Sequence, residues 1–173
     1  MSFKKNLANY ITSLRIIGTL CIVFLTPLTP LYFVIYTITG VTDVLDGLIS
    51  RLTHTTSEFG ARLDSIADLL FYTVSLVKLL PVLIDILPSF IWIIVALIMS
   101  LRILSYIIAA VKLNRFASRH SIPNKITGVL VFAVPYFLVS PADVVYCFIV
   151  CFAGLFSTLE DLYAHITAKA VTE

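Results

Sequence analysis

Four aspartates at regular intervals lie inside a chain that is otherwise strongly apolar. They fall within the segment TDVLDGLISRLTHTTSEFGARLDSIADLL and are Asp43, Asp46, Asp64 and Asp68. A carboxylate at the centre of a membrane helix costs about 2.5 to 3.5 kcal/mol on insertion scales, so a cluster of carboxylates is expected to face a wet cavity and to share a cation. The cluster is therefore a predicted functional site.

The spacing of the aspartates predicts two helical faces that carry carboxylates. Asp43, Asp46 and Gly47 stand at i, i+3 and i+4, which is one face of a helix. Asp64 and Asp68 stand at i and i+4 on the next predicted helix. Oxygen ligands without histidine or cysteine suit one or two ions of Mg²⁺ or Mn²⁺, and magnesium usually keeps phosphate oxygens among its ligands. All four aspartates are candidate metal ligands, and a nucleotide or pyrophosphate is the expected second partner.

Three residues between the aspartates extend this predicted site. Arg51, one helical turn after Gly47, is placed to meet phosphate oxygens, while Gly47 and Gly60 leave room for a ligand or for close helix contact. The competing interpretation is that the aspartates form structural ion pairs with Arg51 and Arg62, or cap helix ends. Four aspartates interleaved with two glycines and an arginine favour the functional interpretation, because charge inside a membrane is costly.

The rest of the chain predicts the helices that position this cluster. Of its 173 residues, 60% are hydrophobic and 13% are charged, and the mean hydropathy is +1.03. This composition excludes an ordinary soluble domain and predicts an all-α, polytopic membrane protein, with one domain over residues 1–173. A spanning helix needs about 20 mostly apolar residues. Six transmembrane helices are predicted, over residues 10–27, 30–51, 59–81, 88–112, 124–140 and 142–166.

Prolines and basic residues predict how these helices are oriented. A hairpin over residues 52–58 is expected to join the second and third helices, and three short turns on the other side are marked by Pro27 with Pro30, Pro81 with Pro88, and Pro141. Those turns contain no lysine or arginine. Basic residues gather instead at the opposite helix ends, as Lys4, Lys5, Arg15, Arg51, Arg62, Lys112, Arg115, Arg119, Lys125 and Lys169. By the positive-inside rule, both termini and the aspartate cluster are expected to face the cytoplasm.

The remaining polar signals predict little chemistry. Lys4 and Lys5 before an apolar stretch imitate a secretory signal peptide, but no small-residue cleavage site follows. His54, His120 and His165 are not at metal-ligand spacing, so each is expected to be solvated or interfacial. The three cysteines lack a C-x-x-C pair and are expected to be small apolar filler. The net charge of +2 gives no sign of a nucleic-acid partner.

The aspartate segment resembles the signature of the CDP-alcohol phosphotransferases, D-x2-D-G-x2-A-R-x8-G-x3-D-x3-D. Ser50 replaces the usual alanine, and the other positions are filled at every required interval by Asp43, Asp46, Gly47, Arg51, Gly60, Asp64 and Asp68. The six predicted spans also match the fold of that family. The resemblance therefore extends over essentially the whole chain.

This resemblance implies an integral-membrane enzyme that moves a phosphatidyl group from CDP-diacylglycerol to a small alcohol and releases CMP. It implies that Asp43, Asp46 and Asp64 hold the metal and that Asp68 is the general base. It also implies a homodimer among membrane lipids. The residues implied to line the CDP-lipid site are Gly47, Ser50, Arg51 and Gly60.

Residues outside the signature bear on the identity of the acceptor alcohol. Arg102 within the fourth predicted span, with Lys125 at the start of the fifth, is a candidate acceptor-binding pair because both cations suit a phosphate. The alternative for Arg102 is snorkelling or a salt bridge to an aspartate. The stretch NLANYITSLR resembles the N-x-x-T-x-x-R of phosphatidylglycerophosphate synthases, which favours glycerol 3-phosphate. The motif LDSIADL is closer to phosphatidylserine synthases, and an inositol phosphate acceptor is a further alternative.

Two functions outside this family compete with the transferase. A non-enzymatic cation carrier also uses intramembrane aspartates, but it predicts acidic residues through the depth of the bilayer rather than at one end. A membrane pyrophosphatase or lipid phosphatase would use the same metal site with water as acceptor.

Overall fold

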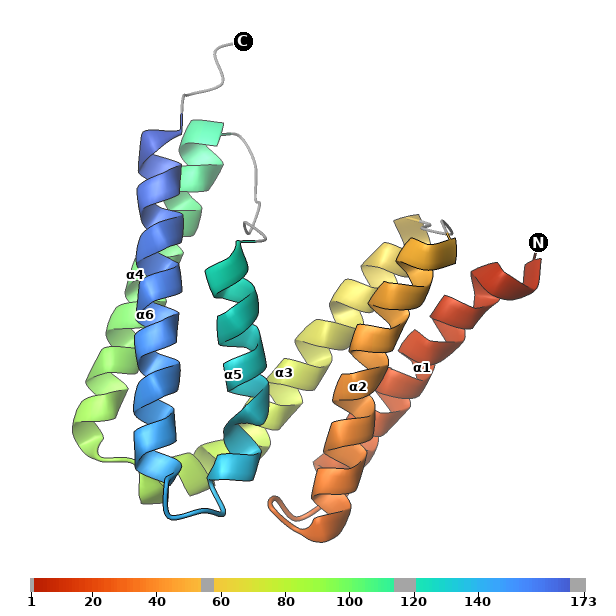
Figure 1. Cartoon of the computed structure of the whole chain (residues 1–173), viewed down its shortest axis with the longest axis horizontal. Coiled ribbons are helices and arrows are strands. Elements are labelled where there is room, and N and C mark those ends of the chain that lie inside the picture. Colours follow the sequence, from red (N-terminus) through yellow and green to blue (C-terminus); the bar gives the residue numbers. More distant parts are fainter. Residues whose placement is uncertain (1, 54–57, 114–120, 169–173) are drawn as a thin grey trace. The chain divides into compact units, whose positions relative to one another are not determined.

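The computed structural model consists of helices and connecting turns (Figure 1). It describes residues 2–53, 58–113 and 121–168, and within them the side chains of residues 10, 12–42, 63, 66–112 and 121–168. All regular secondary structure in these ranges is helical, so the predicted all-α class is confirmed. The helices are α1 (Ser2–Phe24), α2 (Pro30–Thr53), α3 (Glu58–Ile86), α4 (Ser89–Leu113), α5 (Ile122–Phe137) and α6 (Asp143–Thr167).

Helix boundaries follow the predicted windows with three differences. Helix α1 begins at Ser2 rather than at residue 10. Pro81 lies inside α3 rather than ending it, so the predicted turn at Pro81 is wrong, and the chain turns at Pro88 instead. Continuing the helix past a proline keeps the neighbouring backbone groups bonded within the helix, which matters most where no water is available. The predicted hairpin over residues 52–58 is also too long, because α2 extends to Thr53 and α3 begins at Glu58.

Among the described residues, three helical segments are long and apolar enough to cross a membrane: Ile66–Ile86, Ser89–Lys112 and Asp143–Thr167. The apolar stretches described in the other helices are shorter. In α5 the helix itself has 16 residues, or about 24 Å at 1.5 Å per residue, against a hydrocarbon core of about 30 Å. A membrane protein is therefore supported, while six spans and cytoplasmic termini stay predictions.

The chain divides into two compact units, residues 1–85 and 86–173. In the first unit, α1 and α2 run side by side (Figure 1). They lie close together at Gly18, where an added methyl group would collide with the hydroxyl oxygen of Thr39. Aromatic rings join α2 to α3, with the centroids of Tyr36 and Phe71 5.2 Å apart. Helix α3 also reaches α1 through Lys78, whose Nζ donates a 2.9 Å hydrogen bond to the carbonyl of Val23.

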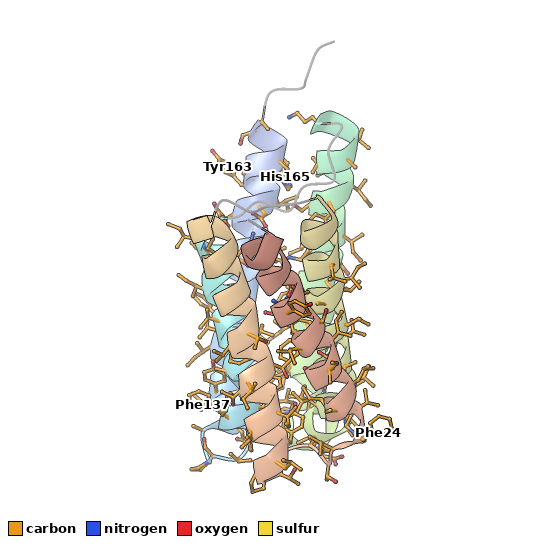
Figure 2. All side chains as sticks on the ribbon, turned by 90° about the vertical axis from the view of Figure 1, so that its right-hand side faces the viewer. Phe24, Phe137, Tyr163 and His165 are labelled. Carbon is orange, nitrogen blue, oxygen red and sulfur yellow. The ribbon has the colours of Figure 1, made fainter. Side chains whose placement is uncertain are left out.

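In the second unit, α6 packs against both α4 and α5. Gly154 lies at this contact, where an added methyl group would be at ordinary van der Waals distance from Ile98 on α4 and Thr127 on α5. The rings of Phe137 and Tyr146 stack with centroids 3.8 Å apart. Tyr163 on α6 is 70% exposed and His165 is 3% exposed, so the helix presents one side outward and one inward (Figure 2).

Candidate active site

Asp68 is the one signature aspartate whose side chain the structure describes, and it forms an ion pair with Arg15. Arg15 Nη1 donates to Asp68 Oδ1 at 2.7 Å, linking α1 to α3 across 53 residues of sequence. The two partners differ sharply in exposure: the Arg15 side chain is 1% exposed and the Asp68 side chain 39%. The pair therefore consists of a buried cation and an accessible carboxylate.

The burial of Arg15 follows from the pattern of α1. Thr12, Arg15, Thr19 and Ile22 recur at three- or four-residue spacing, and all four are buried. That spacing puts them on one face of the helix. Thr19 adds a local contact, because its hydroxyl donates to the Arg15 carbonyl at 2.9 Å. Arg15 is thus held in the packed face of α1, and its charge is directed to Asp68.

The exposure of Asp68 follows from the pattern of α3. Ala67, Phe71, Ser75 and Leu79 recur every four residues and form a buried face. Asp68 stands one position away from this face, about 100° around the helix. Its side chain therefore lies at the edge of the packed surface, where one oxygen contacts Arg15 while part of the group stays accessible.

The other signature residues are placed as positions only. Asp43, Asp46, Gly47, Ser50 and Arg51 belong to the last part of α2, and Gly60 and Asp64 belong to the first part of α3. Within the first unit these two helix segments lie at the same end (Figure 1). Their side chains, with that of Arg62, lie outside the described residues, so the predicted metal site and the competing ion pairs to Arg51 and Arg62 stay predictions.

The donor set nevertheless fits a hard divalent cation. The signature supplies carboxylates alone, which is the ligand chemistry that Mg²⁺ and Mn²⁺ prefer. Among the described side chains there is no group of three or more histidine, cysteine, aspartate or glutamate residues that could hold a metal. The described part of the chain thus offers no rival to the signature as a metal centre.

A second polar cluster lies in the other unit and contains Arg102, the predicted acceptor-binding residue. Arg102 Nη2 on α4 donates to Asn124 Oδ1 on α5 at 2.7 Å, with a longer 3.5 Å contact to the Ser157 hydroxyl on α6. Asn124 Nδ2 in turn donates to Asp161 Oδ2 on α6 at 2.6 Å. Asn124 therefore bridges a partly exposed arginine and an aspartate that is 4% exposed.

The local structure of α5 fixes Asn124 in this bridge. Ser121 caps the helix, and its hydroxyl accepts a hydrogen bond from the Asn124 backbone N–H at 3.4 Å. Pro123 occupies the first turn, where its missing N–H is tolerated. Lys125, the other predicted acceptor-binding residue, is exposed, and its side chain makes none of the hydrogen bonds or ion pairs found among the described residues. The structure does not bring it into the Arg102 cluster.

The prediction for His165 is wrong. The imidazole Nδ1 is 2.9 Å from the Ser105 hydroxyl, and the side chain is 3% exposed rather than solvated. His165 follows Ser157 and Asp161 at four-residue spacing, so the three side chains share the face of α6 that packs inward. The predictions for His54 and His120 lie outside the described residues.

A comparison of the sequence with models of known protein families identifies the family of this chain. The sequence model of the CDP-alcohol phosphatidyltransferases matches residues 5–167. The chain belongs to the CDP-alcohol phosphatidyltransferase family. No curated protein and no solved structure gives a significant match. Family membership agrees with the helical, apolar architecture and identifies a membrane transferase.

Sequence reasoning missed three residues of this phosphatidyltransferase: Arg15 and Asn124 contact the predicted site residues Asp68 and Arg102, and Asp161 contacts Asn124. The sequence analysis places Arg15 among the topological charges and at the arginine of the N-x-x-T-x-x-R stretch. An arginine with apolar neighbours inside a span must pair, which is the argument that singles out Arg102. Asn124 and Asp161 were not singled out. The signal for Asp161 was its spacing from Ser157 and His165 on one helical face, whereas no local signal identified Asn124 as the bridge.

Proposed function

We propose that this phosphatidyltransferase moves the phosphatidyl group of CDP-diacylglycerol to glycerol 3-phosphate and releases CMP. The observation that carries the donor is the family match over residues 5–167, within which the aspartate signature is complete. The accessible carboxylate of Asp68, backed by a buried cation, supports a general base at that position. Phosphatidylserine and phosphatidylinositol-phosphate type synthesis are the alternatives within the family.

The proposed reaction is one substitution at phosphorus. The acceptor hydroxyl oxygen forms a bond to the lipid-side phosphorus of the pyrophosphate, and the bond from that phosphorus to the bridging oxygen breaks. The electron pair leaves with CMP. The hydroxyl proton passes to the carboxylate of Asp68, a role that general bases of this kind perform when within hydrogen-bond reach.

The remaining signature residues have supporting roles in this proposal. Asp43, Asp46 and Asp64 would hold one or two Mg²⁺ or Mn²⁺ ions, with Asp68 at the margin of the ligand set. Such an ion neutralises negative charge that develops on the pyrophosphate and the leaving group. The CDP-lipid is proposed to contact Gly47, Ser50, Arg51 and Gly60.

Arg102 supports an anionic acceptor. Its hydrogen-bond partners on α5 and α6, Asn124 and Ser157, are neutral, and among the described side chains no carboxylate forms an ion pair with the guanidinium. The group is partly exposed, and a guanidinium binds phosphate with two parallel hydrogen bonds. Lys125 is proposed only as an additional exposed cation near the start of α5.

The wider setting of the enzyme is also proposed. Six membrane spans, an active site facing the cytoplasm and a homodimer agree with the distribution of basic residues and with the family resemblance. The partners are then CDP-diacylglycerol, the acceptor alcohol, membrane lipids and a second copy of the chain, without nucleic acid.

The test is CMP release by the purified protein from CDP-diacylglycerol. Glycerol 3-phosphate, serine, inositol, inositol phosphate and no acceptor are offered in parallel with Mg²⁺ or Mn²⁺, and a chelator removes the metal in a matched set. Release that depends on glycerol 3-phosphate and on metal is expected. If CMP release depends on another alcohol, that alcohol is the acceptor in place of glycerol 3-phosphate. CMP release without any alcohol would favour a hydrolase. Metal flux into liposomes without CMP release would favour the cation carrier.

A further inference from the structure

The ion pair between Arg15 and Asp68 has a geometry suited to holding a reactive carboxylate. The 2.7 Å contact has the length of a charge-assisted hydrogen bond, and it involves Nη1 of a planar guanidinium whose direction is fixed. The arginine is 1% exposed, so its side chain is surrounded by packed atoms. A buried arginine cannot follow the carboxylate if the carboxylate moves, and it therefore defines where Asp68 Oδ1 lies.

Fastening α1 to α3 does not by itself explain this pair. Lys78 already joins the same two helices, by donating to the Val23 carbonyl at 2.9 Å. That link uses a neutral backbone acceptor and a partly exposed lysine, which avoids burying a charge. Burying Arg15 is more costly, because a buried cation is stable only when it is paired and hydrogen-bonded. The choice of an arginine at this position calls for a role beyond attachment.

A positive charge beside the signature also changes its electrostatics. Asp68 shares α3 with Asp64 at i and i+4, and like charges at that spacing repel each other. A permanent cation on the Asp68 side of the cluster offsets this repulsion without occupying a metal position. Arg15 keeps its charge at any working pH.

We infer that Arg15 is a positioning residue for Asp68: it fixes the carboxylate in one orientation and supplies a permanent positive charge at the edge of the aspartate cluster. This inference rests on the proposed function, because it takes Asp68 as the group that accepts the hydroxyl proton. Arg15 itself contacts Asp68 and is assigned no contact with substrate. It acts on the reaction through the geometry and charge of its partner.

Arg15→Gln is the first variant to measure, in the full-length protein. The fold is expected to survive, because a neutral amide replaces a buried cation and the carboxylate left behind is 39% exposed to water. Misplacing a catalytic group by about 1 Å costs roughly a hundredfold in rate, and we expect kcat to fall by about that factor. The KM for CDP-diacylglycerol should stay within about threefold, because only the transition state is affected.

Binding of Mn²⁺ alone, followed by the paramagnetic signal of the free ion, supplies a readout independent of turnover. Removing a cation near the cluster should leave Mn²⁺ affinity unchanged or tighter. A purely structural role predicts the opposite, with metal affinity, thermal stability and kcat falling together. Arg15→Lys keeps the charge but not the planar fork, so it should recover part of kcat.

Lys78→Gln is the matched control, because it removes a cation that joins the same two helices away from the signature. It should match the wild type in kcat and in Mn²⁺ affinity. Wild-type kcat in Arg15→Gln, or parallel losses in Arg15→Gln and Lys78→Gln, would overturn the positioning role. A wild-type protein that releases no CMP with any acceptor would overturn the proposed function instead, and the inference with it.

Discussion

The two units of this phosphatidyltransferase each contain a link between an arginine and an aspartate, and the two links bury opposite charges. In the first unit the arginine is buried and the aspartate is accessible, as Arg15 and Asp68. In the second unit the aspartate is buried and the arginine is partly exposed, as Asp161 and Arg102. The first link is a direct ion pair, whereas the second passes through the side chain of Asn124.

This difference indicates what each unit offers to a ligand. The buried partner is held by packing and fixes the direction of the accessible one, so the accessible group is the one available to a substrate or an ion. The first unit presents a carboxylate, which suits a metal ion or a proton. The second presents a guanidinium, which suits a phosphate or a carboxylate. The proposed function assigns the carboxylate to the metal and the proton, and the guanidinium to an anionic acceptor.

The strongest test of the carboxylate side is Asp68→Asn. Asparagine keeps an oxygen that accepts from Arg15 but no longer takes a proton at neutral pH. General-base catalysis contributes about a hundredfold to ten-thousandfold, and CMP release should fall by a factor in that range. Mn²⁺ binding and thermal stability should be largely kept.

The matched control for that test is Asp85→Asn, the same substitution on an exposed residue near the end of α3. It should leave CMP release at the wild-type level. Turnover by Asp68→Asn equal to that of Asp85→Asn would show that Asp68 is not the base. The accessible carboxylate of the first unit would then have no assigned role in catalysis.

The guanidinium side is tested by Arg102→Gln. Loss of a charge-assisted contact to phosphate removes about 1.5 to 3 kcal/mol, which corresponds to roughly a tenfold to hundredfold rise in KM for glycerol 3-phosphate. The KM for CDP-diacylglycerol should not change. Steady-state kinetics with each substrate varied in turn measure both values.

Lys112→Gln is the control for Arg102→Gln. Lys112 is a second cation on α4, and its Nζ donates to the carbonyl of Ile166 rather than to the Asn124 bridge. Its KM for the acceptor should equal that of the wild type. Equal changes in the two variants would mean that Arg102 contributes general surface charge and not a specific contact.

The buried end of the second link is tested by comparing Asp161→Leu with Asp161→Asn. Leucine removes the Asp161 oxygen to which the part-buried Asn124 amide donates, and the loss of such an acceptor costs up to about 3 kcal/mol. Asparagine keeps an oxygen there and should cost less. Thermal unfolding in detergent measures the difference, and equal stability of the two variants would show that Asp161 does not hold the bridge.

The smallest expected effect concerns the packing that surrounds Arg15. Gly18 lies one turn after Arg15, and Gly18→Ala would force the Thr39 hydroxyl from its 2.7 Å hydrogen bond to the Ile35 carbonyl. Overpacking costs about 1 kcal/mol or more, so the unfolding temperature should fall modestly. Gly128→Ala is the control, because nothing lies within 4 Å of the added carbon. A loss in Gly128→Ala as large as that in Gly18→Ala would contradict the close contact of α1 and α2.

Much of the helical architecture could be predicted from the sequence because it depends on local patterns. Apolar windows interrupted by polar or proline-rich segments gave six helices with ends within a few residues of those observed, apart from the earlier start of α1 at Ser2 and the turn expected at Pro81. Proline removes one backbone hydrogen bond, but the surrounding apolar residues favour continuing the helix. The sequence pattern marks the proline without deciding which of these effects is larger.

The sequence by itself determined the aspartate spacing, the apolar helices and, through the signature, the family, because each depends on residues close together in the chain. Only the tertiary structure decided which charges pair. Asp68 meets Arg15 across 53 positions and Asn124 meets Asp161 across 37. Such contacts depend on how whole helices pack, and packing depends on the shapes of many side chains at once. The same dependence explains why His165 is buried against Ser105 although its sequence neighbours gave no sign of a partner.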